Sequence, residues 1–97
     1  MNKPKPRAID FFLHEELIFW SFRYFLGRQT IATRDFAERL ARSWEHLSER
    51  NQALIKSELE VAFIEDDQAR DSGETFKPLG ADCDRKGWEL VRKAYKK

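Results

Sequence analysis

The residues best suited to bind a charged ligand gather around one turn of the chain. Arg23 and Arg28 flank the end of an aromatic-rich segment, Thr30 follows in the turn, and Arg34 opens the next expected helix. Arginine presents a planar fork of donors that matches phosphate, and a helix N-terminus adds free backbone N–H groups and a positive dipole. Tyr24 could stack on a base. These five residues therefore predict a binding site for the phosphate of a nucleotide.

The same arginines also have a purely structural interpretation. The segment 48–75 carries a net charge of −5 and is rich in Glu and Asp. Ion pairs between neighbouring helices are common, so Arg23 and Arg28 could pair with these acids and hold the helices together. The sequence leaves both interpretations open.

A second group of residues runs from Lys77 to Arg85 and is followed by Trp88. Pro78 and Gly80 restrict the backbone to a particular tight loop. Such a loop either packs the following helix against the rest of the protein or shapes a binding site. Packing is the first expectation and a site is the second.

Catalytic signatures are missing from the sequence. It has no P-loop, no GxGxxG and no HExxH. His14 and His46 fall in different expected helices, and Cys83 has no histidine at motif distance. We therefore predict a protein that is not an enzyme and has no catalytic residues; a catalytic pair formed only in space is the alternative.

Two acidic runs could suggest a metal site, but each has a simpler explanation. Residues 65–67 read Glu-Asp-Asp without the alternating ligands and glycine of a calcium loop, so we expect a solvated helix end. Residues 82–84 read Asp-Cys-Asp, which is typical of a helix cap with a small packed thiol. The sequence predicts neither a metal site nor a cofactor.

Size and composition favour one cytoplasmic domain. Ninety-seven residues make a single domain, and one cysteine cannot form an internal disulfide. We find neither a signal peptide nor an apolar run long enough to cross a bilayer. The net charge of +1 hides a −5 segment at 48–75 and a +4 segment at 76–97. A membrane is therefore not expected as a partner. Nucleic acid is not favoured as a partner and is expected only through a local patch, formed by the basic N-terminal tail with Arg34, Arg39 and Arg42.

Helical periodicity covers most of the chain, and no run alternates as a strand would. Residues 1–9 form an expected flexible basic arm, and residues 10–97 form a single helical domain. The expected fold is all-α, a compact bundle of three long helices plus a C-terminal helix. These helices are expected over about Asp10–Leu26, Arg34–Leu47 capped by Thr33, Glu49–Arg70 capped by Ser48, and Asp82 or Asp84 to Lys96.

The first expected helix is unusually apolar. It holds seven of the thirteen aromatic residues of the chain, so apolar side chains surround almost the whole helix. A helix of this kind must be buried on most sides. Either it is the central helix of the core, or its surplus apolar surface forms an interface with a second copy of the chain or another partner. We expect a homo-oligomer that associates through this helix.

Taken together, these segments resemble a group of small accessory proteins encoded by bacteriophages and prophages. The resemblance rests on RYxLGRxT at 23–30, Trp44, the Asp pair at 66–67 and KPLGxDCDRxxW at 77–88, and it covers roughly residues 20–92. A weaker similarity is to the Thoeris anti-defence sponges, which sequester cyclic nucleotide immune signals without degrading them.

The resemblance implies a counter-defence protein that acts in the cytoplasm of the host cell. Its first expected function is to hold a cyclic nucleotide-type signal without cleaving it. The alternative is a protein-binding inhibitor of a host defence nuclease or CRISPR effector, which would use the aromatic first helix or the acidic third helix.

Overall fold

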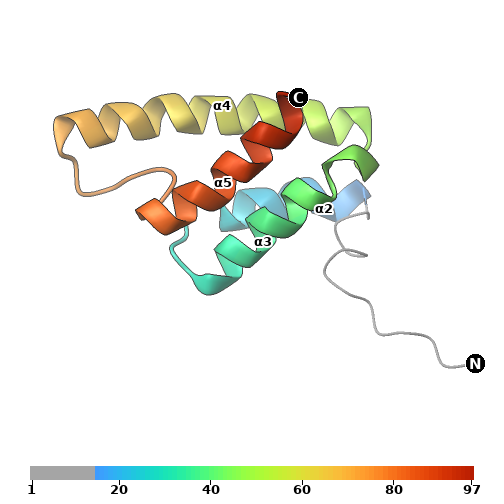
Figure 1. The fold of residues 1–97 in the computed structure, drawn as a ribbon, viewed down its shortest axis with the longest axis horizontal. Coiled ribbons are helices and arrows are strands. Elements are labelled where there is room, and N and C mark those ends of the chain that lie inside the picture. Colours follow the sequence, from blue (N-terminus) through green and yellow to red (C-terminus); the bar gives the residue numbers. More distant parts are fainter. Residues whose placement is uncertain (1–14) are drawn as a thin grey trace, which may run out of the picture.

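The computed structural model describes residues 15–97, and over this range the protein is all-α (Figure 1). No strand occurs among these residues, so the predicted fold class is confirmed. The predicted arm at 1–9 and the predicted helix start at Asp10 lie outside the described residues. The helices are α2 (Glu15–Phe25), α3 (Ile31–Arg42), the short 3-10 helix η1 (Trp44–His46), α4 (Glu49–Ser72) and α5 (Asp82–Tyr95).

Helix α3 begins earlier than the sequence predicted. Thr30 is the N-cap, with an extended backbone and a side-chain oxygen that accepts the Thr33 N–H at 3.0 Å. The predicted cap, Thr33, instead lies within the helix, and its hydroxyl is 2.9 Å from that of Thr30. Both threonines are good caps by type, and the sequence alone pointed to the wrong one.

The predicted continuation of this helix to Leu47 is also wrong, because α3 ends at Arg42. The Ser43 N–H bonds to the carbonyls of both Arg39 and Leu40, which tightens the backbone into a 3-10 turn. This turn still places Trp44 and Leu47 in the core.

Helix α4 follows the prediction closely. The Ser48 side chain accepts the Asn51 N–H at 3.1 Å, so the predicted cap is confirmed. The helix continues two residues beyond Arg70 and stops at Gly73, whose φ of +70° is the left-handed conformation that favours glycine at a helix end.

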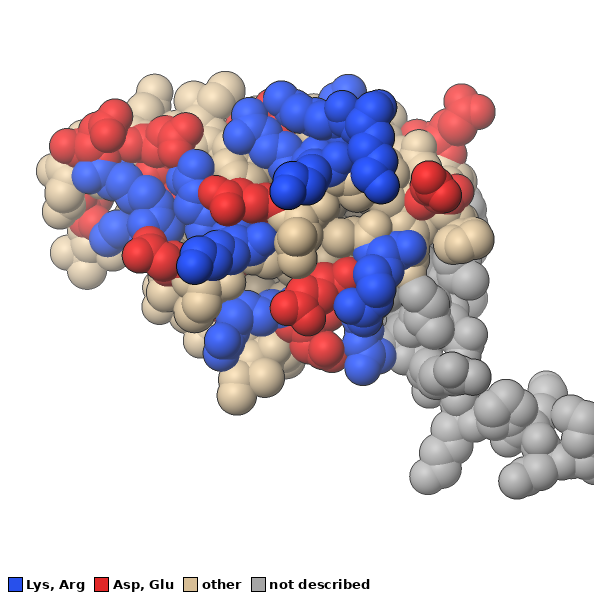
Figure 2. Space-filling view, in the orientation of Figure 1, with Lys and Arg blue, Asp and Glu red and all other residues tan. Residues whose placement is uncertain are grey.

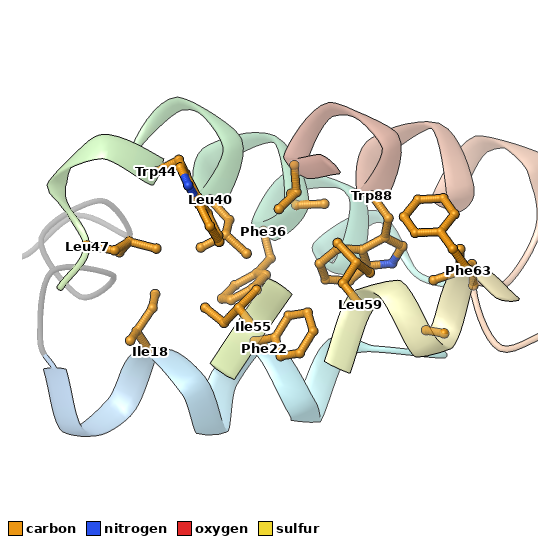
Figure 3. Close-up of a cluster of buried hydrophobic side chains, with 14 residues drawn as sticks. Ile18, Phe22, Phe36, Leu40, Trp44, Leu47, Ile55, Leu59, Phe63 and Trp88 are labelled. Carbon is orange, nitrogen blue, oxygen red and sulfur yellow. The ribbon is translucent and has the colours of Figure 1, made fainter. Parts of the chain in front are cut away.

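The core is built from all the helices around one aromatic centre (Figure 3). Trp88 of α5 is fully buried and meets Phe22 of α2 edge-on, with ring centroids 5.6 Å apart. Phe36 of α3 also lies against Trp88, with ring centroids 6.3 Å apart. Helix α5 can pack this close to α3 because residue 87 is a glycine. A Cβ atom at Gly87 would lie only 3.1 Å from that of Ala37. Figure 1 shows the two helices side by side, with α4 running across the top of the view.

Not every large aliphatic side chain of α4 and α5 is buried. Leu54 of α4 is 37% exposed and Leu90 of α5 is 45% exposed. Helix α2 is also not enclosed over its described length, because only Ile18 and Phe22 are fully buried. The interpretation of this helix as a central core helix is therefore wrong for the described residues.

Candidate functional site

The two sequence motifs meet at one end of the bundle. Gly27, in the turn after α2, lies close to the loop before α5, where a Cβ at its position would be 3.4 Å from the Pro78 carbonyl oxygen. A Cβ atom at Gly80 would likewise lie 3.1 Å from Cγ of Gln29. Both glycines have positive φ, +89° and +77°, so the close approach and the backbone conformation favour glycine at both positions.

A buried carboxylate holds this end together. Asp66 of α4 is fully buried and accepts hydrogen bonds from Arg70 Nε at 2.6 Å, from Arg85 Nη1 and from the Leu79 backbone N–H at 3.1 Å. Burial alone would raise its pKa, but these donors outweigh burial and hold the pKa of Asp66 below its usual value. Asp66 therefore stays ionised and anchors the loop to α4.

The two arginines of this network have further partners. Arg70 also donates to Asp82 at 2.8 Å and to the Gly80 carbonyl at 2.9 Å. Arg85 also pairs with Asp67 at 2.8 Å and with Glu89 at 3.2 Å. The packing interpretation of the 77–85 loop is thus the one that the geometry supports.

The solvated helix end expected at residues 65–67 is wrong for Asp66, which is fully buried, and the acidic run at 82–84 also has a structural role. The Asp84 carboxylate accepts the Ala81 N–H at 3.1 Å and closes the start of α5. Cys83 is exposed, so the predicted packed thiol is wrong. Over residues 15–97, no group of three or more His, Cys, Asp or Glu side chains could hold a metal ion. The same part of the chain has no helix that is long and apolar enough to cross a membrane.

Two of the five predicted ligand-binding residues form ion pairs within the protein. Arg23 Nη1 lies 3.6 Å from Glu58 of α4, and Arg34 Nε lies 3.7 Å from Asp84 of α5. Arg23 is therefore directed towards α4 and Arg34 towards α5. This is the ion-pair alternative that the sequence left open for Arg23.

The other three lie together at the end of α2. The Arg28 guanidinium sits 4.1 Å above the centre of the Tyr24 ring, and its Nε donates to the Tyr24 carbonyl oxygen. Thr30, which caps α3, is exposed beside them. The hollows along α3 and α5 include Arg34 in their lining but none of the other four. The five residues thus do not converge on a single pocket.

Helix α2 carries an exposed face that is not part of the predicted phosphate site. Leu17, Trp20 and Tyr24 are 39%, 65% and 59% exposed and follow helical i, i+3, i+7 spacing. With Arg28, which stacks on Tyr24, they form what we call the outer α2 face. The excess of aromatic residues in this segment was the signal that could have identified it.

Comparison of the chain with known protein families, with curated proteins and with solved structures found no match.

Proposed function

We propose that this protein acts by binding another polypeptide through the outer α2 face. The observation that carries the proposal is the exposure of Trp20 and Tyr24, one turn apart, with the Arg28 guanidinium stacked on the tyrosine. Trp, Tyr and Arg are the side chains most enriched at the energetic centres of protein interfaces. Tyr24 and Arg28 also belong to the first sequence motif, and their main described contacts are with each other and Phe25.

The shape of this face favours a polypeptide over a small molecule. Small-molecule sites are concave and enclose most of the ligand, whereas Trp20 and Tyr24 stand on the outside of a single helix. A helix with an apolar stripe fits instead into a groove on a partner protein. The stripe from Leu17 to Tyr24 spans about 10 Å along the helix axis.

The kind of partner follows from the resemblance to phage accessory proteins. We propose that the partner is a host defence protein, such as a nuclease or CRISPR effector, and that the bound protein blocks its action. No step in this function needs a catalytic residue of the protein itself.

The test compares two aromatic surfaces of equal exposure. Trp20→Ala combined with Tyr24→Ala should abolish protection of a phage on a defence-carrying host, while Phe76→Ala should leave it intact, because Phe76 is 68% exposed but lies far along the chain in the loop after α4. A photo-crosslinking residue at position 20, but not at position 76, should capture one protein in stoichiometric yield. If the double variant protects as well as the unmodified protein, the outer α2 face is not the binding surface.

Self-association through the same face is a distinguishable outcome of this experiment. Crosslinks from position 20 to a second copy, together with a dimer mass in analytical ultracentrifugation that Trp20→Ala abolishes, would make the partner another copy of the chain. Such a result would support the predicted homo-oligomer and overturn the host-protein assignment.

Sequestration of a cyclic nucleotide is a second candidate, supported by one observation. Tyr24, Arg28 and Thr30 are all exposed beside the N-terminus of α3, where a base could stack and a phosphate could meet an arginine. Calorimetric titration with a panel of cyclic nucleotides should then show binding that Arg28→Ala removes and Arg50→Ala preserves. Nucleotide affinity unchanged by Arg28→Ala would exclude this site.

A further inference from the structure

A groove lies between α3 and α5, formed by two adjoining hollows of about 440 and 530 Å³ that share Glu38, Leu90 and Lys93. A third hollow of about 580 Å³ adjoins the groove at Lys93 and is lined only by α5 and the two lysines that follow it. Gly87, Ala41 and Ala94 help to line the groove, and their small size leaves space between the two helices. None of the residues in the outer α2 face lines this groove.

Basic side chains line the groove from both helices. On α5, Lys86 and Lys93 lie on one side of the helix, two turns apart, and Lys97 follows. On α3, Arg34 and Arg42 lie two turns apart, also on one side of their helix. Figure 2 shows lysine and arginine gathered most densely over the C-terminal part of α5.

Most of these basic side chains form no ion pair within the described part of the protein. Over residues 15–97, Arg42, Lys86, Lys93 and Lys97 have no carboxylate within ion-pair distance, whereas Arg34 pairs with Asp84. Basic residues in the last turn of a helix are favoured by its dipole, which accounts for Lys93. The dipole does not account for Lys86 or Arg34, which lie nearer the N-terminal ends of their helices.

The groove also contains acids, and these limit its strength. Glu38 lies between Arg34 and Arg42 on α3, and Glu45 lies beyond them. Glu89 of α5 already forms an ion pair with Arg85. The four unpaired cations still outnumber the two unpaired acids, so the groove presents net positive charge to a ligand.

We infer that this groove binds the phosphodiester backbone of a double-stranded nucleic acid without sequence preference. The rise between Lys86 and Lys93 is about 10 Å, close to three phosphate steps of one strand of duplex DNA. Cations in a row match a ligand with charges in a row. The protein as a whole has a net charge of only +1, so the structure concentrates on one face a basic character that the overall composition does not show.

The other polyanions fit the groove less well. A single strand needs exposed aromatic side chains on which its bases stack, but the aromatic residue lining the groove, Trp44, is only 6% exposed. An acidic amphipathic helix needs several large apolar anchors, and Leu90 is the one large aliphatic side chain in the lining.

The test measures how the affinity for a short fluorescein-labelled DNA duplex depends on salt. Four cations predict a slope of log K against log salt of about −3.6, which is a loss of about 150-fold between about 50 and 200 mM salt. Lys86→Gln with Lys93→Gln should reduce the slope to about −1.8. Arg50→Gln with Lys77→Gln removes the same charge outside the groove and should leave the slope unchanged.

A gain of affinity provides the sharper result, because a misfolded variant would not produce it. Glu38→Gln removes the carboxylate between Arg34 and Arg42 and should tighten duplex binding severalfold at low salt. Glu74→Gln, a matched change in the exposed loop after α4, should not. If the groove and control double variants weaken binding equally, binding follows net charge alone and the inference is overturned.

Two further outcomes also overturn it. One is the absence of duplex binding at low salt. The other is a polyglutamate peptide that binds more tightly than the duplex and loses affinity on Lys86→Gln with Lys93→Gln, which would make the ligand an acidic protein. This inference is independent of the proposed function, because Trp20→Ala with Tyr24→Ala should not alter duplex binding.

Discussion

Replacing Asp66 by alanine should be among the most destabilising polar substitutions in this protein. The side chain is fully buried and accepts hydrogen bonds from Arg70, Arg85 and the Leu79 N–H. The alanine variant leaves the Leu79 N–H without its acceptor, which costs about 1–3 kcal/mol. It also removes the shared anion from two cations whose remaining carboxylate partners are all exposed, so the total reaches about 3–5 kcal/mol.

The matched control is Asp67→Ala, which removes another carboxylate from the same Arg85. Asp67 is largely exposed, and exposed ion pairs contribute about 0.2–1 kcal/mol. Urea denaturation followed by tryptophan fluorescence should therefore separate the two variants by at least about 2 kcal/mol. Equal costs for Asp66→Ala and Asp67→Ala would refute the idea that Asp66 anchors the loop before α5.

The effect should also depend on pH in one direction. Folding lowers the pKa of Asp66 from its ordinary value of 3.8, so its ionised form stabilises the folded protein above that pH. This stabilisation is lost as the pH falls through the lowered folded-state pKa. The difference in stability between unmodified protein and Asp66→Asn should therefore be largest near neutral pH and shrink below about pH 4. A difference that stays constant down to pH 2 would contradict this reasoning.

Three further predictions concern the loop glycines, the core and one partly buried phenol. Gly80→Ala should cost more than Gly73→Ala in urea denaturation, because both have positive φ but only Gly80 has neighbours as close as 3.0 Å; equal costs would show that backbone strain alone decides. Trp88→Ala should destabilise by about 3–5 kcal/mol, measured by circular dichroism at 222 nm; a cost below about 1 kcal/mol would mean that Trp88 does not centre the core. Burial and a hydrogen bond to a carboxylate raise the pKa of Tyr95, so its absorbance change near 295 nm should come above the usual pH of about 10; a normal titration would exclude that bond.

The sequence predicted the helices well because their signals are local. Ser48 and Gly73 define α4 through side-chain chemistry and backbone conformation that involve only nearby residues. The error at Thr30 and Thr33 has the same origin, since both threonines satisfy the local rule and only the path of the turn decides between them.

The candidate site was harder to predict because it depends on which residues meet in space. The pairing of Arg34 with Asp84 joins positions 50 residues apart, and nothing local distinguishes it from a free arginine. The excess of apolar residues in α2 did indicate an interaction surface. Because apolar residues surround the helix, their periodicity does not tell which side of α2 faces the core. The groove between α3 and α5 exists only because these two helices pack together, so no single segment encodes it.

The position of Trp88 has a consequence for how the protein is made. The aromatic centre receives Phe22 and Phe36 from helices that are synthesised early, but Trp88 comes from the last helix. A nascent chain that lacks α5 leaves both phenylalanines without their central partner and exposes apolar surface. Stable folding must therefore wait until α5 has been translated, so the native core does not form progressively as α2, α3 and α4 emerge.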